Sequence, residues 1–325
     1  MDELSRQFIN QFQGGFPLLE QPFASIAAGL DTDETNLISM IQDLLADGVL
    51  SRFGPLYDAV RMGGGLTLAA LRVPEKDFDR VAEQVNSLPE IAHNYRREHA
   101  LNMWFVIATE RPEGIQQTID KIESCTGLPV YSFPKLQEYY VGLWLLLDAQ
   151  GGVTTRSFEM PTRTIDVVLD DLDRSIVRAT QGGLPLVSEP FADVAQQAGS
   201  DVATVIRRLS RMIDNGVIRR IGAVPNHYRL GLKSNGMSVW DVAESRLDAL
   251  GEEIGKLDFV SHCYQRPRHL PMWRYNLFAM VHGHNGDEVA RKIGEIANIL
   301  GEDCNAHEVL FSSAILKKSG LRLVA

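Results

Sequence analysis

The chain has 325 residues, 45% of them apolar, and a formal net charge of −10. Its length suggests about two domains of roughly 150 residues, and the apolar fraction suits packed cores. No run approaches the ~20 apolar residues of a membrane span and the first residues are acidic and polar, so we expect a cytoplasmic protein without a membrane partner. The negative charge disfavours non-specific binding to nucleic acid. Three widely spaced cysteines predict neither a disulfide framework nor a zinc site.

The sequence repeats itself. Residues 13–54 align without a gap to residues 181–222 at an offset of 168, with 15 of the 42 positions identical. A His-x-Tyr-x-Arg motif follows in both halves, at residues 93–97 and 262–266. We interpret the chain as a duplicated unit and expect its function to lie in the repeated motif.

Each half begins with the pattern of a helix-turn-helix. In the first half, an acidic cap at residues 31–34 precedes apolar residues at spacings of three and four, and Gly48 is placed to end that helix. The second half repeats the pattern, with Ser200 or Asp201 as the cap and Gly216 as the end. We therefore predict two helix-turn-helix domains of winged-helix type. The helices expected in the first of them are 5–12, 16–30 and 33–47.

After each helix-turn-helix, the pattern changes to strands and helices in the order βαββαβ, which is typical of a ferredoxin-like antiparallel sheet with both helices on one face. We expect the free faces of the two sheets to pack together as a pseudo-dimer within one chain, leaving a cleft. The predicted fold class is thus α+β. The expected elements are 66–73, 75–87, 90–97, 102–109, 113–126 and 139–147, then 236–242, 246–256, 259–266, 275–282, 286–300 and 307–316. The expected domains are 1–60 and 165–230 (helix-turn-helix), 61–148 and 231–325 (ferredoxin-like), and a linker at 149–164.

Histidines cluster around the repeated motif, because six of the eight lie at residues 93–99 and 262–284. Strand alternation places the His, Tyr and Arg of each motif on one face. Three polar side chains would each need a partner against a helix-packed core, so we expect them to face the cleft. These six residues are His93, Tyr95, Arg97, His262, Tyr264 and Arg266.

Arginine and aromatic residues crowd the same windows. Arginine binds carboxylates through two parallel hydrogen bonds, and aromatic side chains suit a flat apolar ring. The predicted ligand is therefore a polycarboxylate with a large planar body. Histidine can donate protons or bind iron axially, and the residues alone leave both roles open beside a structural one. The further candidates are Arg96, His99, Trp104, Arg268, His269 and Arg274.

Two strings resemble known proteins. The helix-turn-helix followed by βαββαβ resembles the Lrp/AsnC regulators, while HNYRREHALNMWFVIAT and SHCYQRPRHLPMWRYNLFAMVHG resemble the two subunit types of siroheme decarboxylase, here fused. The resemblance implies that the C12 and C18 acetate carboxyls of siroheme leave as CO2, giving 12,18-didecarboxysiroheme on a route to heme d1 or heme. It implies no metal of the protein's own and no cofactor beyond the iron tetrapyrrole substrate.

The resemblance also implies roles for the candidates. His93 and His99 are the expected catalytic acids, and His262 and His269 are their counterparts or contacts to the substrate. His99 or His262 is the expected axial contact to the substrate iron. The residues expected to bind the substrate are Tyr95, Arg96, Arg97, Trp104, His262, Tyr264, Arg266, Arg268, His269 and Arg274.

Two other functions stay open from the sequence. One is a DNA-binding regulator of the Lrp/AsnC type, for which the second helix-turn-helix offers Arg207, Arg208 and Arg211, although residues 33–47 hold no Lys or Arg to contact phosphate. The other is a tetrapyrrole carrier without turnover. His99 aligns with Arg268, so we do not expect equivalent sites. The sequence leaves open whether one cleft or two is active and whether fused chains form a homodimer.

Overall fold

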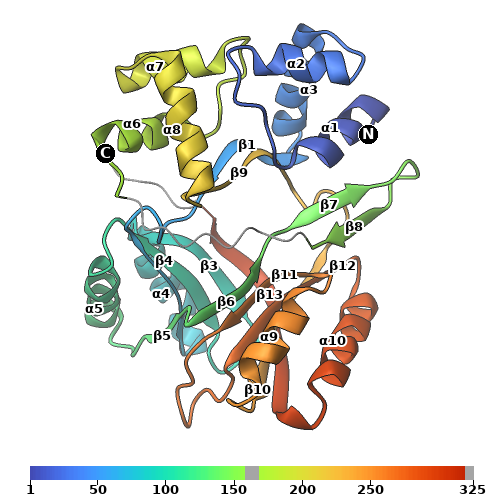
Figure 1. Cartoon of the computed structure of the whole chain (residues 1–325). Coiled ribbons are helices and arrows are strands. Elements are labelled where there is room, and N and C mark those ends of the chain that lie inside the picture. Colours follow the sequence, from blue (N-terminus) through green and yellow to red (C-terminus); the bar gives the residue numbers. More distant parts are fainter. Residues whose placement is uncertain (158–167, 319–325) are drawn as a thin grey trace.

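The computed structural model describes residues 1–157 and 168–318. Two helix-turn-helix modules lie together at one end of the molecule, and a curled β-sheet with helices on its outer side forms the other end (Figure 1). The predicted α+β class, with helix-turn-helix and ferredoxin-like parts repeated in tandem, is confirmed. None of the described helices is long and apolar enough to cross a membrane.

The two helix-turn-helix modules are built alike. The side chains of Asp33 and Asp201 cap the third helix of each module. Each accepts a hydrogen bond from the backbone N–H of the third helical residue, Asn36 or Thr204. The second helix of the first module begins at Pro22, because proline fits the first helical position, where its missing N–H leaves no bond unmade. Residues 16–21, which we expected to be helical, precede it and are not. The helices are α1 (Glu3–Phe12), α2 (Pro22–Gly29), α3 (Glu34–Ala46), α6 (Asp171–Thr180), α7 (Pro190–Ala198) and α8 (Val202–Asp214).

Strands β1 (Leu50–Tyr57) and β9 (Ile218–Pro225) join the two modules, a pairing that the sequence did not predict. Gly54 lies opposite Gly222 in this antiparallel ribbon. A Cβ atom on Gly222 would lie 2.2 Å from the carbonyl oxygen of Phe12, so only glycine allows this close approach. The two modules therefore form one unit around the ribbon.

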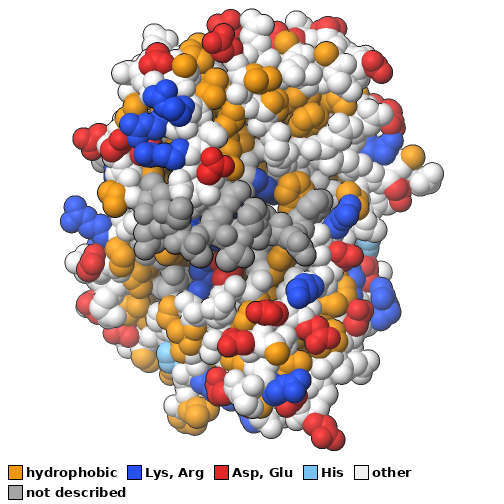
Figure 2. Space-filling view, in the orientation of Figure 1, with side chains coloured by type: hydrophobic (Ala, Val, Ile, Leu, Met, Phe, Trp, Pro, Cys, Tyr) orange, Lys and Arg blue, Asp and Glu red, His pale blue; other side chains and the backbone are white. Residues whose placement is uncertain are grey.

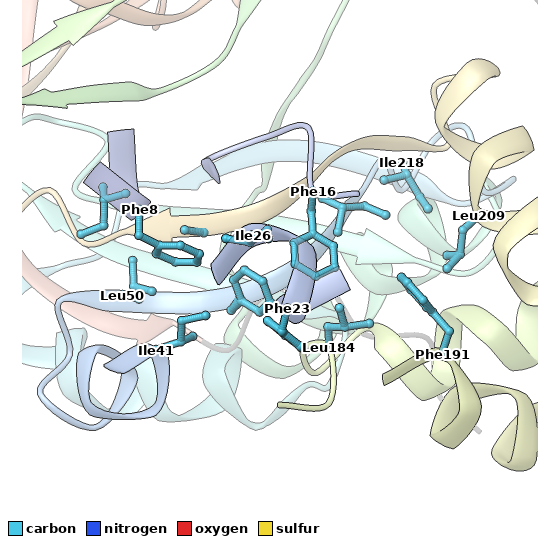
Figure 3. Packing of buried hydrophobic residues seen from close by; sticks show 14 of the residues in the cluster. Phe8, Phe16, Phe23, Ile26, Ile41, Leu50, Leu184, Phe191, Leu209 and Ile218 are labelled. Carbon is cyan, nitrogen blue, oxygen red and sulfur yellow. The ribbon is translucent and has the colours of Figure 1, made fainter. Parts of the chain in front are cut away.

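This unit has a single hydrophobic core with contributions from both modules (Figure 3). Phe16 packs against Phe23 and Phe53, with ring centroids 5.4 and 5.2 Å away. Leu184 and Phe191 reach the same core from the second module. The paired modules thus bury apolar surface that each would expose alone.

Within the described residues, nine antiparallel strands form one sheet in the order β5-β2-β4-β3-β13-β10-β12-β11-β6. Helices α4 (Phe78–Ser87), α5 (Gly114–Thr126), α9 (Leu247–Gly255) and α10 (Gly286–Leu300) cover its outer face (Figure 1). The strands are β2 (Gly65–Leu71), β3 (Ile91–Arg97), β4 (Met103–Thr109), β5 (Tyr131–Pro134), β6 (Gln137–Val141), β10 (Ser234–Val242), β11 (Val260–Gln265), β12 (Leu277–Gly283) and β13 (Cys304–Lys318).

The last sheet strand of each half pairs with a strand of the other half. β13 pairs with β10 of its own half up to Phe311 and with β3 of the first half from Ser312 onward. In the same way, β5 pairs with β2, whereas β6 pairs with β11 of the second half. The two predicted sheets are therefore one continuous sheet that curls on itself.

The inner face of the curled sheet holds a cluster of apolar residues from both halves. Trp104 and Phe133 come from the first half, and Trp273 and Phe278 from the second; ring centroids of neighbouring members lie 5.0 to 6.0 Å apart. The expected packing of one half-sheet against the other is thus confirmed. We call these four residues the aromatic cluster.

The expected strand at 139–147 divides into two strands. β6 joins the large sheet, while β7 (Trp144–Leu147) pairs with β8 (Val153–Arg156) in a hairpin. Asn10 and Gln13 of the first module donate side-chain hydrogen bonds to carbonyl groups of β7. The first part of the expected linker is therefore the turn and second strand of this hairpin, and its residues 158–164 lie outside the described residues.

Candidate functional site

The two His-x-Tyr-x-Arg motifs form two matching columns on the inner face of the sheet. The first column is His93, Tyr95 and Arg97 on β3. The second column is His262 and Tyr264 on β11, with Arg266 directly after that strand. Alternate residues of β3 point the other way: Asn94 bonds to Asn86 of α4, and Arg96 lies 4.3 Å from the ring of Phe78. Strand alternation thus separates Arg96 from the column, although it was predicted to bind the substrate.

The two columns have similar internal geometry. The ring centroids of His and Tyr lie 6.2 Å apart in the first column and 6.0 Å apart in the second. Each guanidinium lies over the tyrosine ring of its column, at 5.8 Å for Arg97 and 4.8 Å for Arg266. Each also donates to a carbonyl of the opposite half, Arg97 to Leu310 and Arg266 to Phe133. Neither half could therefore complete its column alone.

Arg97 and Arg266 are buried cations. Only 6% of Arg97 and 8% of Arg266 is exposed, and burial lowers the pKa of each guanidinium to about 10. Over the described part of the chain, neither forms an ion pair with a carboxylate, and the Nε atom of each has no hydrogen-bond partner. A buried charge without a counter-ion is costly, and a bound anion would offset that cost.

A charged group lies beside the second column. Arg219 of β9 bonds to Asp58 at 2.5 Å and to Glu138 of β6 at 3.1 Å. Burial alone would raise the pKa of Glu138, but Arg219 and Lys135 outweigh it and lower that pKa to about 2. At the offset of the repeat, Arg219 corresponds to Ser51, so the first half cannot form this group.

The first column instead lies near Tyr228, from the turn between β9 and β10. Burial, followed by the nearby phenol of Tyr228, raises the pKa of Tyr95. Burial likewise raises the pKa of Tyr264 in the second column. Both column tyrosines are therefore neutral phenols at neutral pH, able to donate a hydrogen bond but weaker acids than an exposed tyrosine.

The other two predicted histidines lie beside the aromatic cluster, close to the arginine ends of the columns: the backbone N–H of His99 donates to the carbonyl of Arg97, and the ring of His269 meets Phe133, with centroids 4.8 Å apart. Nε2 of His99 is 3.3 Å from the carboxylate of Glu308, and its ring meets Trp273 edge-on, with centroids 5.4 Å apart. Nε2 of His269 lies 2.7 Å from the carbonyl oxygen of Ser132. The side chains of His99 and His269 thus contact the aromatic cluster and its surroundings, and in the described part of the chain no side-chain hydrogen bond joins them to the column histidines.

Trp104 is fully buried in the aromatic cluster. Its Nε1 donates to the carbonyl of Leu101, and its ring stacks on Phe133 with centroids 5.1 Å apart. Arg266 touches the same cluster through Phe133 and Phe278. Trp104 therefore supports the columns through the cluster and presents no free ring face.

Three predicted arginines are paired with carboxylates of the protein itself. Arg96 bonds to Glu75 on the helix side of β3. Arg268 and Arg274 both lie 2.7 Å from carboxylate oxygens of Asp241. Their charges are already neutralised, so they are weaker candidates for carboxylate binding than Arg97 and Arg266.

Sequence reasoning missed three residues beside His262. The hydroxyl oxygen of Ser261 lies 2.7 Å from Nδ1 of His262 and 2.6 Å from Nε2 of His282, whose Nδ1 in turn bonds to Asn235. His282 falls in the histidine-rich window, which was a signal. The other two become its neighbours only through the pairing of β10, β12 and β11.

Each column offers a cation for a carboxylate, a phenol that keeps its proton, and an imidazole. This set can bind an organic polyanion and transfer a proton to it. Among residues 1–157 and 168–318, no group of three or more His, Cys, Asp and Glu side chains is placed to hold a metal ion.

Two family models match the chain, each in both halves. The AsnC-like ligand binding domain matches residues 62–139 and 229–317. The siroheme decarboxylase NirDL-like HTH domain matches residues 5–50 and 173–219. The models thus follow the duplication seen in the sequence and in the fold.

Similar proteins cover the whole chain or one half of it. The siroheme decarboxylase of Hydrogenobacter thermophilus is 32% identical over 313 residues, which is 94% of this chain and 90% of that protein. The siroheme decarboxylase NirH subunit of Pseudomonas aeruginosa is 58% identical over 152 residues, 47% of this chain and 89% of that subunit.

A solved structure agrees. The crystal structure of the siroheme decarboxylase NirDL in co-complex with an iron-uroporphyrin III analogue superposes with a TM-score of 0.73 and 28% identity, covering 98% of this chain and 93% of that chain. Matched in both halves by the same family models and nearly end to end by full-length relatives, the chain belongs to the siroheme decarboxylase family, in its fused NirDL form.

Proposed function

We propose that this chain is a carboxy-lyase that removes the C12 and C18 acetate carboxyls of siroheme as CO2 and yields 12,18-didecarboxysiroheme. Membership of the siroheme decarboxylase family supports the reaction. The related crystal structure with an iron-uroporphyrin III analogue supports an iron tetrapyrrole as the ligand. We expect the substrate's own iron to be the only metal that takes part, with no further cofactor.

The observation that carries the proposal is the pair of buried cations, Arg97 and Arg266. Each lies at the end of a column, and within the described residues neither has a carboxylate partner. A polycarboxylate that entered between the columns would supply both counter-ions, and guanidinium groups bind carboxylates through two parallel bonds. The two arginines therefore fix the orientation of the macrocycle by holding carboxylates that are not lost.

The reaction needs a proton from the protein. When the C–C bond to the carboxylate breaks, its electron pair stays on the macrocycle side, and the exocyclic carbon must take up a proton to become a methyl group. Tyr95 and Tyr264 are neutral phenols, and burial raises their pKa values, so they suit hydrogen bonding to the substrate better than proton transfer. His93 lies beside Tyr95 and remains our proposed acid of the first column. A positioned acid contributes about 100- to 10,000-fold to such a step.

The contacts of the second helix-turn-helix disfavour a DNA-binding regulator. Arg208 bonds to Asp170 and Asp173, and Arg211 also bonds to Asp173. Figure 2 shows basic side chains over the region of α6 and α8 with acidic side chains directly beside them. Arginines that are neutralised in this way release few counter-ions from DNA phosphates, which is where non-specific affinity comes from.

Anaerobic incubation of the full chain with siroheme, without added cofactor, tests the proposal. We expect mass spectrometry to show a product that has lost two CO2. Siroheme that binds but stays chemically unchanged would instead identify a carrier. A chain that does not bind siroheme, but binds duplex DNA in a salt-sensitive way at low ionic strength, would identify a regulator.

A further inference from the structure

A chain of hydrogen bonds runs behind the second column. It links Asn235 of β10, His282 of β12, Ser261 and His262 of β11, and we call these four residues the imidazole network. Ser261 is 1% exposed and His282 is 4% exposed, so water does not compete for the bonds at its centre. The network ends at His262, the one member that belongs to a column.

The position of the protons in this network follows from its first member. The Nδ2 group of Asn235 donates to the carbonyl of Leu232, which fixes the amide so that its Oδ1 faces His282. An amide oxygen only accepts hydrogen bonds, so Nδ1 of His282 must carry a proton. Burial, with His227, His262 and Lys292 nearby, lowers the pKa of His282 well below its usual value. His282 is therefore neutral, and its Nε2 is an acceptor.

The proton positions on Ser261 and His262 follow from the acceptor at Nε2 of His282. The hydroxyl of Ser261 has one proton, and it donates that proton to Nε2 of His282, 2.6 Å away. The hydroxyl oxygen must accept from Nδ1 of His262, 2.7 Å away. The ring of neutral His262 carries a single proton. That proton is on Nδ1, and the lone pair is on Nε2.

We propose that Asn235, His282 and Ser261 are positioning residues that hold His262 in its Nδ1–H tautomer and so present Nε2 as an electron-pair donor to the iron of the bound tetrapyrrole. In the described residues no hydrogen bond occupies Nε2 of His262, whereas Nδ1 is taken by Ser261. An imidazole held in this way donates its Nε2 lone pair to an electron-poor centre such as iron. Because its only proton is on Nδ1 and bonded to Ser261, it has no proton on Nε2 to give to the exocyclic carbon. This inference rests on the proposed function, because it takes the ligand to be an iron tetrapyrrole.

The first half provides an internal control. Leu66 pairs with Ala108 across β2 and β4, as Asn235 pairs with His282 across β10 and β12. Both β3 and β11 have a bulge just before the column histidine, at Ala92 and at Ser261 respectively. The three positions of the network, Asn235, His282 and Ser261, are thus occupied by the apolar residues Leu66, Ala108 and Ala92 in the first half.

Nitrogen-15 NMR of histidine-labelled protein without ligand tests the tautomer directly. We expect His262 to be protonated at Nδ1 in the wild type at neutral pH. The variants Ser261→Ala and Asn235→Leu, which copy the first half, should move the proton toward Nε2. Ser261→Thr keeps the hydroxyl and should retain the Nδ1–H form. A wild-type His262 protonated at Nε2 would overturn the inference, whether or not the protein turns over siroheme.

Binding of two probes tests the contact to iron. Ser261→Ala should weaken binding of iron(III) uroporphyrin III about tenfold, because residues that orient a ligating histidine typically contribute that much to metal affinity. Binding of metal-free uroporphyrin III should not change, and the visible and EPR spectra of the iron complex should lose the signature of a nitrogen ligand. Equal weakening of both probes, or spectra that Ser261→Ala and His262→Ala leave unchanged, would contradict the contact. If these binding and spectral results are obtained but the wild-type protein does not decarboxylate siroheme, only the proposed reaction is contradicted.

Discussion

The two columns carry the same three residue types and differ in their surroundings. In the second half, Ser261 and His282 stand behind the column histidine and Arg219 lies beside it, whereas the aligned positions of the first half are Ala92, Ala108 and Ser51. The shared residues include the buried arginines, which suit anion binding. The differing residues set which nitrogen of a histidine holds a proton. Duplication has thus kept the buried arginines in both halves, and in our proposal it divides the proton chemistry between them.

The largest expected effect tests what the columns share. Arg97→Met and Arg266→Met should each lower kcat/KM for siroheme about 100-fold, because a charge-assisted pair with a carboxylate contributes about 1.5–3 kcal/mol. The melting temperature of ligand-free Arg97→Met should stay constant or rise, because methionine removes a buried charge to which no carboxylate of the described residues is bonded; Arg266→Met should gain less, because Glu138 lies near enough to Arg266 to raise its pKa. Steady-state decarboxylation and thermal unfolding of the same preparations measure both quantities.

Arg97→Lys is the matched control for this experiment. It keeps the charge but loses the planar fork, so we expect it to recover part of the affinity and little of the orientation. If Arg97→Met instead lowered activity and melting temperature together, the arginine would be structural, and the shared feature of the columns would not be anion binding.

The sequence predicted the parts of this site that depend on local pattern. Alternation along one strand placed His93, Tyr95 and Arg97 on a common face, and the acidic caps located α3 and α8. The same rule could have removed Arg96 from the site, because it lies on the opposite face of β3.

The parts that the sequence missed depend on which strands become neighbours. β13 reaches β3 of the other half, and β1 pairs with β9, through contacts between residues more than 150 positions apart. Asn235 meets His282 only because β10 pairs with β12. Similarly, the ion pairs of Arg268 and Arg274 require Asp241 from a different strand. No periodicity within one segment reports such pairings.

The next expected effect tests what the columns do not share. The pKa of His262 is about 4 in the folded protein, against 6.5 ordinarily, because of burial and then Arg219; Glu138 opposes this shift, and Arg266 and Lys135 reinforce it. Between about pH 6.5 and pH 4 the unfolded chain therefore binds a proton that the folded chain does not. The free energy of unfolding should fall as pH falls through this window, by about 2 kcal/mol for a half-buried ring that water partly screens.

Urea unfolding of wild type and His262→Asn across that range measures this difference. The variant lacks the titrating ring, so its stability should fall less steeply between pH 6.5 and pH 4. Parallel pH profiles for the two proteins would mean that His262 is as easily protonated folded as unfolded, and the contrast between the halves would lose its basis.

The smallest expected effect is that of Arg96→Ala, because Arg96 lies on the helix-covered face of β3, whereas Arg97 lies on the inner face. Arg96 pairs with Glu75, which is largely exposed, and rests on Phe78, so Arg96→Ala should cost at most about 1 kcal/mol of stability. Its kcat/KM for siroheme should stay within about twofold of wild type, while Arg97→Met, one residue further along, loses about 100-fold. Both substitutions remove one positive charge from β3, so a general electrostatic effect on a polyanionic substrate would lower both activities alike. Only a substrate bound at the inner face would make the two variants differ in kcat/KM. Equal losses of kcat/KM would mean that the substrate does not bind at the columns.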